Sequence, residues 1–197
     1  MKKTIFDKKY WNNRYIHQQT GWDIGNISTP LKTYIHQLDN KNLSILIPGC
    51  GNGYEAAYLL QQGFTNITLI DIAIDAVAAL KIKWKEYDGK QLRIICGDFF
   101  EMNETFDLIL EQTFFCALEP VFRNNYVHKM AELLKEEGKL AGVLFNRSFT
   151  GGPPFGGSKE EYTILFSQKF TIKIMEDCYN SISSRAGTEL FFIANKK

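Results

Sequence analysis

Three glycines follow the first apolar run of this sequence. The stretch IPGCGNGYE places Gly49, Gly51 and Gly53 between an apolar segment and a helix-like one. Glycine allows a sharp turn and a close approach of backbone to ligand, and the N–H groups of the following helix stay exposed beyond it. A tight strand-to-helix turn alone would also use glycine. The spacing G-x-G-x-G has Tyr54 where the dinucleotide pattern has its third glycine, so a pyrophosphate fits less well.

Acidic residues end the next two apolar runs. Asp71 lies about 20 residues beyond the first glycine, where an acid accepts hydrogen bonds from both hydroxyls of a ribose. Asp98 follows the third run in CGDFF, where its carboxylate can accept a hydrogen bond from an adenine amino group and Phe99 can lie against the ring. Glu111 ends the fourth run, near the place expected for the rest of such a ligand. Taken alone, each acid could also be a solvated side chain at a strand end or in a turn, with no ligand to bind.

Short strand-like runs alternate with helix-like stretches, which predicts a parallel sheet covered by helices on both faces. The expected strands are 43–48, 66–71, 92–96, 106–111, 139–145, 170–176 and 188–195. The expected helices are 54–62 (ended by Gly63), 75–84 (capped by Asp75), 120–137 (from Pro120 to Gly138) and one opened by the capping box Ser158–Glu161. The last two strands are expected to pair as an antiparallel hairpin. We predict one domain over residues 1–197.

Glycine loop, ribose acid, adenine acid and closing hairpin, in this order, resemble the S-adenosylmethionine-dependent methyltransferases. Three passages resemble the thiopurine S-methyltransferase family, nearest its thiol/halide (thiocyanate) methyltransferase branch: WNNRYIHQQTGWDIGNISTPL, PGCGNG, and FDLILEQTFFCALEP with GGPPF. The resemblance implies a Rossmann-like class I methyltransferase with a mostly parallel seven-stranded sheet, and S-adenosylmethionine as cofactor. Implied cofactor contacts are Trp11, Tyr15, Trp22, Gly49, Gly51, Asp71, Asp98, Phe99 and Glu111. Two positions depart from the family near the substrate: Glu111 replaces the usual Asp, and Gln112 replaces an Arg or Tyr.

The leading segment holds two of the three tryptophans of the chain. Trp11 and Tyr15 are four residues apart and share a helical face, and Trp22 follows Gly21. Aromatic faces attract a sulfonium cation and exclude water. We therefore expect residues 1–40 to form a helical lid over the cofactor; the alternative is a terminal helix that only packs on the core.

The reaction implied is methyl transfer to a small thiol, thiocyanate or halide, and such nucleophiles need alignment and dehydration rather than a strong base. His17, His36 and His128 are scattered, and we assign no catalytic residue and no metal. Substrate contacts are predicted at Phe115, Phe155 and Tyr179, with Arg185 and Ser181 nearby. Alternatives are a methyltransferase for another small molecule (thiopurine-like, or an oxygen or nitrogen acceptor), a nicotinamide-dependent reductase, or a non-catalytic cofactor-binding module.

Composition excludes several kinds of partner. The 197 residues are 45% hydrophobic and carry a net charge of +1 without a long basic run, so we expect no nucleic acid as partner. No apolar run is long enough to span a bilayer, and Asp7, Lys8 and Lys9 interrupt a signal peptide. The four cysteines show no C-x-x-C spacing. We predict a monomer in the cytoplasm, acting on a small molecule.

Overall fold

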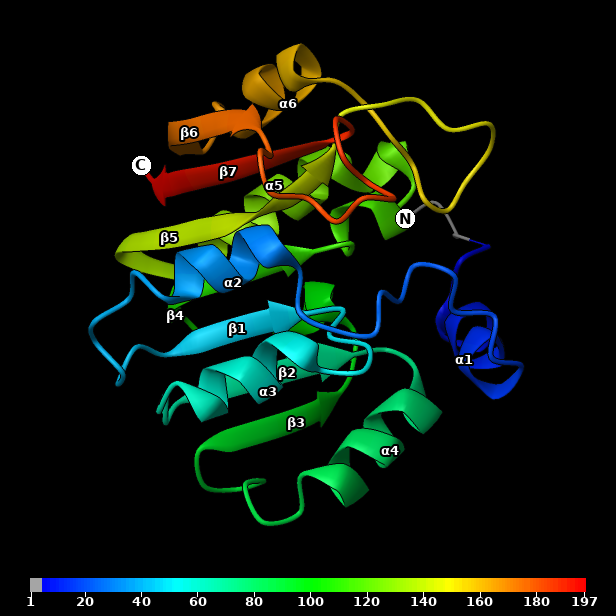
Figure 1. Ribbon diagram of the computed structural model, residues 1–197, viewed down its shortest axis with the longest axis vertical. Helices are drawn as coiled ribbons and strands as arrows, with labels where there is room; N and C mark the ends of the chain where they lie inside the picture. The colour runs from blue at the N-terminus through cyan, green and yellow to red at the C-terminus, as the bar shows by residue number, and fades with distance from the viewer. Residues whose placement is uncertain (1–4) are drawn as a thin grey trace.

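The computed structural model describes residues 5–197, and within this range the strands form one seven-stranded sheet in the order β3-β2-β1-β4-β5-β7-β6 (Figure 1). The strands are β1 Ile45–Pro48, β2 Ile67–Asp71, β3 Leu92–Cys96, β4 Phe106–Gln112, β5 Leu134–Phe145, β6 Phe170–Asp177 and β7 Glu189–Lys196. The helices are α1 Lys8–Ile16, α2 Thr29–Ile35, α3 Tyr54–Gln61, α4 Ile74–Lys83, α5 Arg123–Glu132 and α6 Lys159–Phe166. Short 3₁₀ turns are η1 Phe99–Glu101, η2 Phe115–Ala117 and η3 Pro120–Phe122.

Strands β1 to β5 pair in parallel, and β7 pairs antiparallel with both β5 and β6, which confirms the predicted hairpin. All residues of β1 and β2 are buried, as parallel strands covered on both faces require. One core joins the sheet to α2, α3 and α4, and a second core on the other face joins it to α5 and α6. Helix α1 lies beyond the carboxyl ends of the strands (Figure 1). Within residues 5–197, no helix is long and apolar enough to cross a membrane.

Several local predictions are confirmed by the backbone. Gly63 has a φ of 83° just after α3, the left-handed conformation of a helix C-cap. The Ser158 side chain accepts a hydrogen bond from Glu161 N at 3.3 Å and begins α6. Asp75 is not the N-cap of α4, because Ala73 occupies that place and the Asp75 N–H is bound by the Asn12 side chain of α1.

The helix predicted over 120–137 is shorter in the structure. Helix α5 ends at Glu132, and β5 begins two residues later. Gly138 therefore does not end a helix. The pairing of β4 with β5 shifts register between Phe106 and Leu108, and Glu137 has a φ of 61°. A Cβ on Gly138 would lie 3.1 Å from Phe106 O, so glycine permits the close approach of this irregular strand start.

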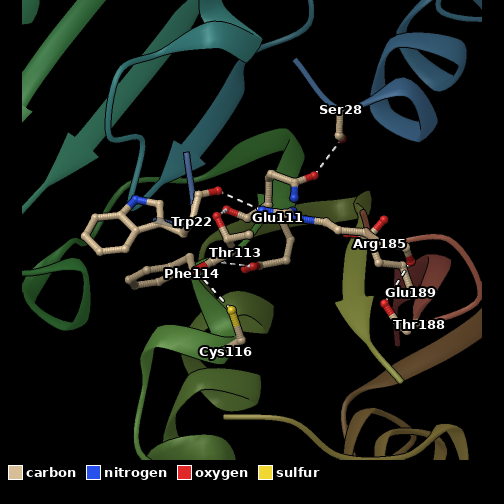
Figure 2. Close-up of polar contacts among 10 residues, drawn as sticks. Trp22, Ser28, Glu111, Thr113, Phe114, Cys116, Arg185, Thr188 and Glu189 are labelled. Atoms are coloured by element: carbon tan, nitrogen blue, oxygen red, sulfur yellow. Dashed lines mark hydrogen bonds and ion pairs between the residues drawn. The ribbon is translucent and has the colours of Figure 1, made fainter. Parts of the chain in front are cut away.

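A buried carboxylate organises the chain beyond β4. Glu111 has 0% exposure, and its Oε1 accepts hydrogen bonds from Phe114 N (2.8 Å) and Phe115 N (2.9 Å). Its Oε2 accepts a hydrogen bond from the Tyr126 hydroxyl of α5 at 2.6 Å. The turn so held includes Thr113 with a φ of 58°, which is rare for a β-branched residue and indicates strain (Figure 2).

Burial raises the pKa of Glu111 to about 7, against the lowering effect of its three hydrogen bonds. A carboxyl whose pKa is raised by folding stabilises the fold below its unfolded pKa, and this contribution is lost as the pH rises through about 7. We predict that Glu111→Gln removes about 3 kcal/mol of this pH dependence of the unfolding free energy between pH 4.5 and 8. Urea unfolding at several pH values measures it.

Glu104→Gln is the matched control, because Glu104 is half exposed and pairs with Arg93 on the surface. It should leave the pH profile of stability unchanged. Parallel pH profiles for the wild-type protein and Glu111→Gln would contradict the assignment of the raised pKa to Glu111.

Candidate cofactor and acceptor site

A cavity of about 1000 Å³ lies at the carboxyl ends of the strands, at the upper end of the size range of small-molecule sites. Helix α1, the glycine loop, the ends of β2 and β3, the turn after β4, the loop after β5 and the β6–β7 connection all contribute to it. Seven predicted cofactor contacts line this large cavity: Trp11, Tyr15, Trp22, Gly49, Asp71, Asp98 and Phe99. The parallel topology brings these distant residues together.

The glycine loop needs its glycines. Gly49, Gly51 and Gly53 have φ values of 58°, 48° and 68°. A Cβ on Gly49 would lie 2.4 Å from the Phe114 ring, and one on Gly51 would lie 2.8 Å from the Tyr15 hydroxyl oxygen. The loop is therefore enclosed on one side by the turn after β4 and on the other by α1.

The two aspartates differ in their surroundings. Asp71 is 8% exposed, and its oxygens accept hydrogen bonds from Gly51 N and Ala73 N, both at 2.9 Å. Burial raises its pKa, and these backbone bonds lower it. Each carboxylate oxygen retains a lone pair that a hydroxyl can use. Asp98 is exposed, and its Oδ1 accepts a hydrogen bond from Phe100 N at 2.9 Å; its Oδ2 has no partner within residues 5–197.

The aromatic residues of the leading segment pack on one another. The Trp22 ring lies edge-on to Trp11 and Tyr15, with centroid distances of 5.5 and 5.9 Å. Burial raises the pKa of the Tyr15 phenol well above its usual value, so this hydroxyl stays protonated. Asn12 joins α1 to α4, since its amide donates to Asp75 Oδ2 and its oxygen accepts from Asp75 N, both at 2.8 Å.

The part of the expected lid (residues 1–40) that lines the cavity ends before α2. Leu31 and Ile35 of that helix are fully buried in the core, so α2 covers the sheet rather than the cavity. The first four residues of the expected lid, 1–4, lie outside the described part of the chain.

A second cavity of about 50 Å³ lies beside the glycine loop. Trp22, Gly49, Thr113 and Arg185 line both cavities, and the predicted contact Gly51 lines only the small one. The charged residues that line the small cavity are Asp23, Glu55 and Arg185.

Glu55 is 6% exposed, and within residues 5–197 no ion pair neutralises it. Burial raises its pKa to about 7, and the nearby Asp23 adds to the effect. Asp23 bridges the leading segment to the glycine loop, because its Oδ2 accepts hydrogen bonds from the Asn52 amide and, at 3.2 Å, from the Tyr54 hydroxyl. An unpaired buried carboxylate favours a cationic partner.

Arg185 connects the β6–β7 connection to this region. It is 8% exposed, pairs with Glu189 at 3.3 Å and donates to the Trp22 carbonyl oxygen at 2.7 Å (Figure 2). This hydrogen bond fixes the backbone of Trp22, one of the predicted cofactor contacts.

Four predicted site residues line neither cavity. Glu111 and Phe115 have 0% and 1% exposure, so neither offers a surface to a ligand in the cavities: the Glu111 carboxylate is bound to Phe114, Phe115 and Tyr126, and the Phe115 ring packs in the core. Phe155 is half-buried and follows Pro153 and Pro154, which do line the large cavity; its ring packs on Phe6, another lining residue, at a centroid distance of 5.7 Å. Tyr179 is 88% exposed, on the outer part of the β6–β7 connection.

Sequence reasoning missed Asp23, Glu55, Thr113 and Arg147, all of which line a cavity. A signal for Glu55 is present, since an acid in the apolar run YEAAYLL directly after the glycine loop is expected to be buried. The three histidines are exposed and line neither cavity.

The sequence is similar to proteins of known activity. A sequence model of the family described as thiopurine S-methyltransferase matches residues 6–190. The probable thiol methyltransferase 2 of Arabidopsis thaliana is 31% identical over 91% of this chain and 81% of its own length. Thiocyanate methyltransferase 1 of Brassica oleracea is 29% identical with the same coverage. The thiopurine S-methyltransferase of Pseudomonas fluorescens is 23% identical over 86% of each chain.

Solved structures agree with the fold. The Burkholderia thailandensis 1,6-didemethyltoxoflavin-N1-methyltransferase, solved with S-adenosylhomocysteine, has a TM-score of 0.75 at 20% identity and covers 96% of this chain and 87% of its own. The fold is thus that of class I methyltransferases, as predicted. The chain belongs to the thiopurine S-methyltransferase family and is an S-adenosylmethionine-dependent methyltransferase.

Proposed function

We propose that this enzyme methylates a small thiol, thiocyanate or halide by in-line displacement, with the donor held at residues of both cavities. The observation that carries the proposal is the large cavity itself, which joins two aspartates and three aromatic rings to an apolar wall. The activities named for the two plant relatives support the choice of acceptor. The monomeric state and the cytoplasmic location stay predictions.

The residues present fit S-adenosylmethionine from one end to the other. In this proposal Asp98 and Phe99, which line the cavity, hold the adenine, and Asp71, one strand away, offers lone pairs to the ribose. The glycine loop on the next strand admits a chain close to its backbone. Trp11, Tyr15 and Trp22 present aromatic faces to a sulfonium, at about 0.5–2 kcal/mol per contact.

The amino-acid end of the donor fits the small cavity. That end is a zwitterion, and Glu55 with Asp23 complements its ammonium group. Trp22, Gly49, Thr113 and Arg185 line both cavities, so the small cavity lies next to the large one. Glu55, rather than Glu111, is therefore the acid proposed to contact the donor.

The bound donor supplies an electrophilic methyl group on a positively charged sulfur. The protein contributes alignment of the nucleophile, at about 3–3.5 Å from the methyl carbon, and exclusion of water. A thiolate needs no base, and no histidine lines the cavity within the described residues. Cys116 lines the cavity, but burial raises the pKa of its thiol well above the usual value, so it is not a nucleophile.

The acceptor class is tested by turnover. Incubation with S-adenosylmethionine and iodide, bisulfide, thiocyanate or benzenethiol should yield the methylated product of at least one of them, measured by gas chromatography. Turnover of an alcohol or amine, with none from any sulfur or halide acceptor, would overturn the acceptor class and leave the family assignment intact.

The adenine contact of Asp98 is tested by changing both the residue and the ligand group that it is proposed to bind. We expect Asp98→Asn to weaken binding of S-adenosylhomocysteine about tenfold, since a hydrogen bond to a charged group is lost. The inosine analogue, which lacks the amino group, should bind equally well to the wild-type protein and the variant in calorimetry. Asp88→Asn is the matched control. The Asp88 carboxylate accepts a hydrogen bond from Ile94 N at 3.2 Å, and Asp88 lines neither cavity.

The ammonium contact of Glu55 is tested by pH. The pKa of Glu55 in the protein without ligand is about 7, and a bound cation favours the ionised carboxylate. Affinity for S-adenosylhomocysteine should therefore rise about tenfold from pH 6 to pH 8. Glu55→Gln should abolish this rise. 5′-Methylthioadenosine, which has no amino-acid end, should bind both proteins alike at every pH; an unchanged pH profile in Glu55→Gln would exclude the contact.

A further inference from the structure

An arginine in the loop after β5 has no partner for its hydrogen-bond donors. Arg147 is exposed and lines the large cavity, and its guanidinium carbon lies 4.8 Å from the centroid of the Phe149 ring. Within residues 5–197 its guanidinium makes neither a hydrogen bond nor an ion pair. A guanidinium stacked on a ring keeps its in-plane N–H donors available at its edge.

The other arginines of the cavity are already engaged. Arg14 donates to the Tyr10 hydroxyl and to Gln19 Oε1. Arg185 is bound to Glu189 and to the Trp22 carbonyl oxygen. Among the described residues that line the cavity, Arg147 is therefore the arginine whose planar pair of donors can receive a ligand carboxylate.

The backbone of Arg147 is held in place. Its carbonyl oxygen accepts a hydrogen bond from Gly157 N at 3.1 Å, and a Cβ on Gly156 would lie only 1.7 Å from that oxygen. The Gly156 carbonyl in turn accepts a hydrogen bond from buried Arg123 of α5 at 2.7 Å. A side chain whose backbone is fixed loses less conformational entropy when it binds a ligand.

An apolar surface lies beside Arg147 in the same cavity. It is formed by Phe145, Phe149, Pro153 and Pro154, with the Phe145 and Phe149 rings edge-to-face at 5.1 Å. The Arg185 guanidinium lies on the other side of this pair, 5.3 Å from the Phe145 centroid. A bare inorganic ion would leave this surface uncovered, whereas an organic ring would cover it.

The order of strands places this surface on the acceptor side. Strand β5 lies next to β4 and three strands from β2, and neighbouring strands are about 5 Å apart. The end of β5, two residues before Arg147, is thus three strand spacings, roughly 15 Å, from the end of β2 that carries Asp71, and one spacing from β4.

We propose that Arg147 determines specificity for an organic thiolate with an apolar ring and a second, remote carboxylate. This inference rests on the proposed function. In the step, a lone pair of the thiolate sulfur forms the new S–CH₃ bond, and the electron pair of the breaking bond stays on the donor sulfur. The remote carboxylate takes no part and is bound by Arg147 throughout.

The probe pair is 4-mercaptobenzoate and benzenethiol, which differ only in the remote carboxylate. The wild-type enzyme should show a 10- to 100-fold higher kcat/KM for 4-mercaptobenzoate. Arg147→Gln should lose that preference through a fall in kcat/KM for 4-mercaptobenzoate that is much larger than the fall for benzenethiol, and Arg147→Lys should retain part of it. Arg93→Gln, which removes a surface arginine of β3 outside both cavities, should behave as the wild-type enzyme.

A binding measurement separates this inference from the proposed function. 4-(Methylthio)benzoate should bind the complex with S-adenosylhomocysteine 10- to 100-fold more tightly than methylthiobenzene does, and this difference should vanish in Arg147→Gln. Glu119 also lines the large cavity. Equal binding of the two thioethers, or a preference for 4-aminobenzenethiol through Glu119, would overturn the role of Arg147 while turnover of benzenethiol still supported the proposed function. Absence of turnover with every thiol would overturn this inference, and absence of turnover with thiocyanate and the halides as well would remove the proposed function too.

Discussion

The arrangement of this site depends on one buried carboxylate. Glu111 connects the end of β4, the strained turn that follows it and helix α5 through three hydrogen bonds. Its paired residue on β5 is Gly142, where a Cβ would lie 2.4 Å from the Glu111 Cβ. Burial raises the pKa of this carboxyl to about 7, and the three donors around it reduce the cost of its ionisation. The turn in turn places the Phe114 ring against Gly49 and Thr113 at the junction of the two cavities.

The sheet arranges the site along one line. Strand tips about 5 Å apart carry, in spatial order, Asp98, Asp71, the glycine loop, the turn after β4 and the loop after β5. In the proposed reaction this order corresponds to adenine, ribose, reacting sulfur and acceptor. Helix α1 lies beyond these tips and has no buried residue; Asn12 binds it to Asp75 of α4, and Asp23, in the segment after the helix, binds Asn52 of the glycine loop. Such contacts have a small free energy and permit opening for ligand exchange.

The cofactor side could be predicted from the sequence because its residues end apolar strands. In a parallel sheet those ends meet at one edge whatever the loops do, so Asp71 and Asp98 come together from their positions alone. Glu111 follows the same rule, yet its side chain turns inward, because the N–H groups of Phe114 and Phe115 and the hydroxyl of Tyr126 solvate it. Local sequence does not specify this choice of partners.

The acceptor side escaped prediction for a different reason. Arg147, Phe149 and Pro153 lie in a loop without periodicity, and their positions depend on the close contact between Gly156 and the Arg147 carbonyl. The end of α5 was predicted too late because the apolar pattern of the helix continues into Leu133 and Leu134, which are buried at the start of a strand. Burial alone cannot distinguish a helix from a strand over so few residues.

The charges of the cavity explain why a site without a strong base suits the proposed chemistry. A cationic donor and an anionic acceptor each lose hydration on entering, and their attraction grows as water leaves. In the proposal Asp71, Asp98 and Glu55 contact the donor and Arg147 contacts the acceptor, so each partner is oriented before the charges are neutralised by transfer of the methyl group. The products have lost the sulfonium charge and the thiolate charge, and with them the attraction between the two ligands. The same aromatic surface that favours the sulfonium therefore holds the thioether less tightly, and this difference favours product release.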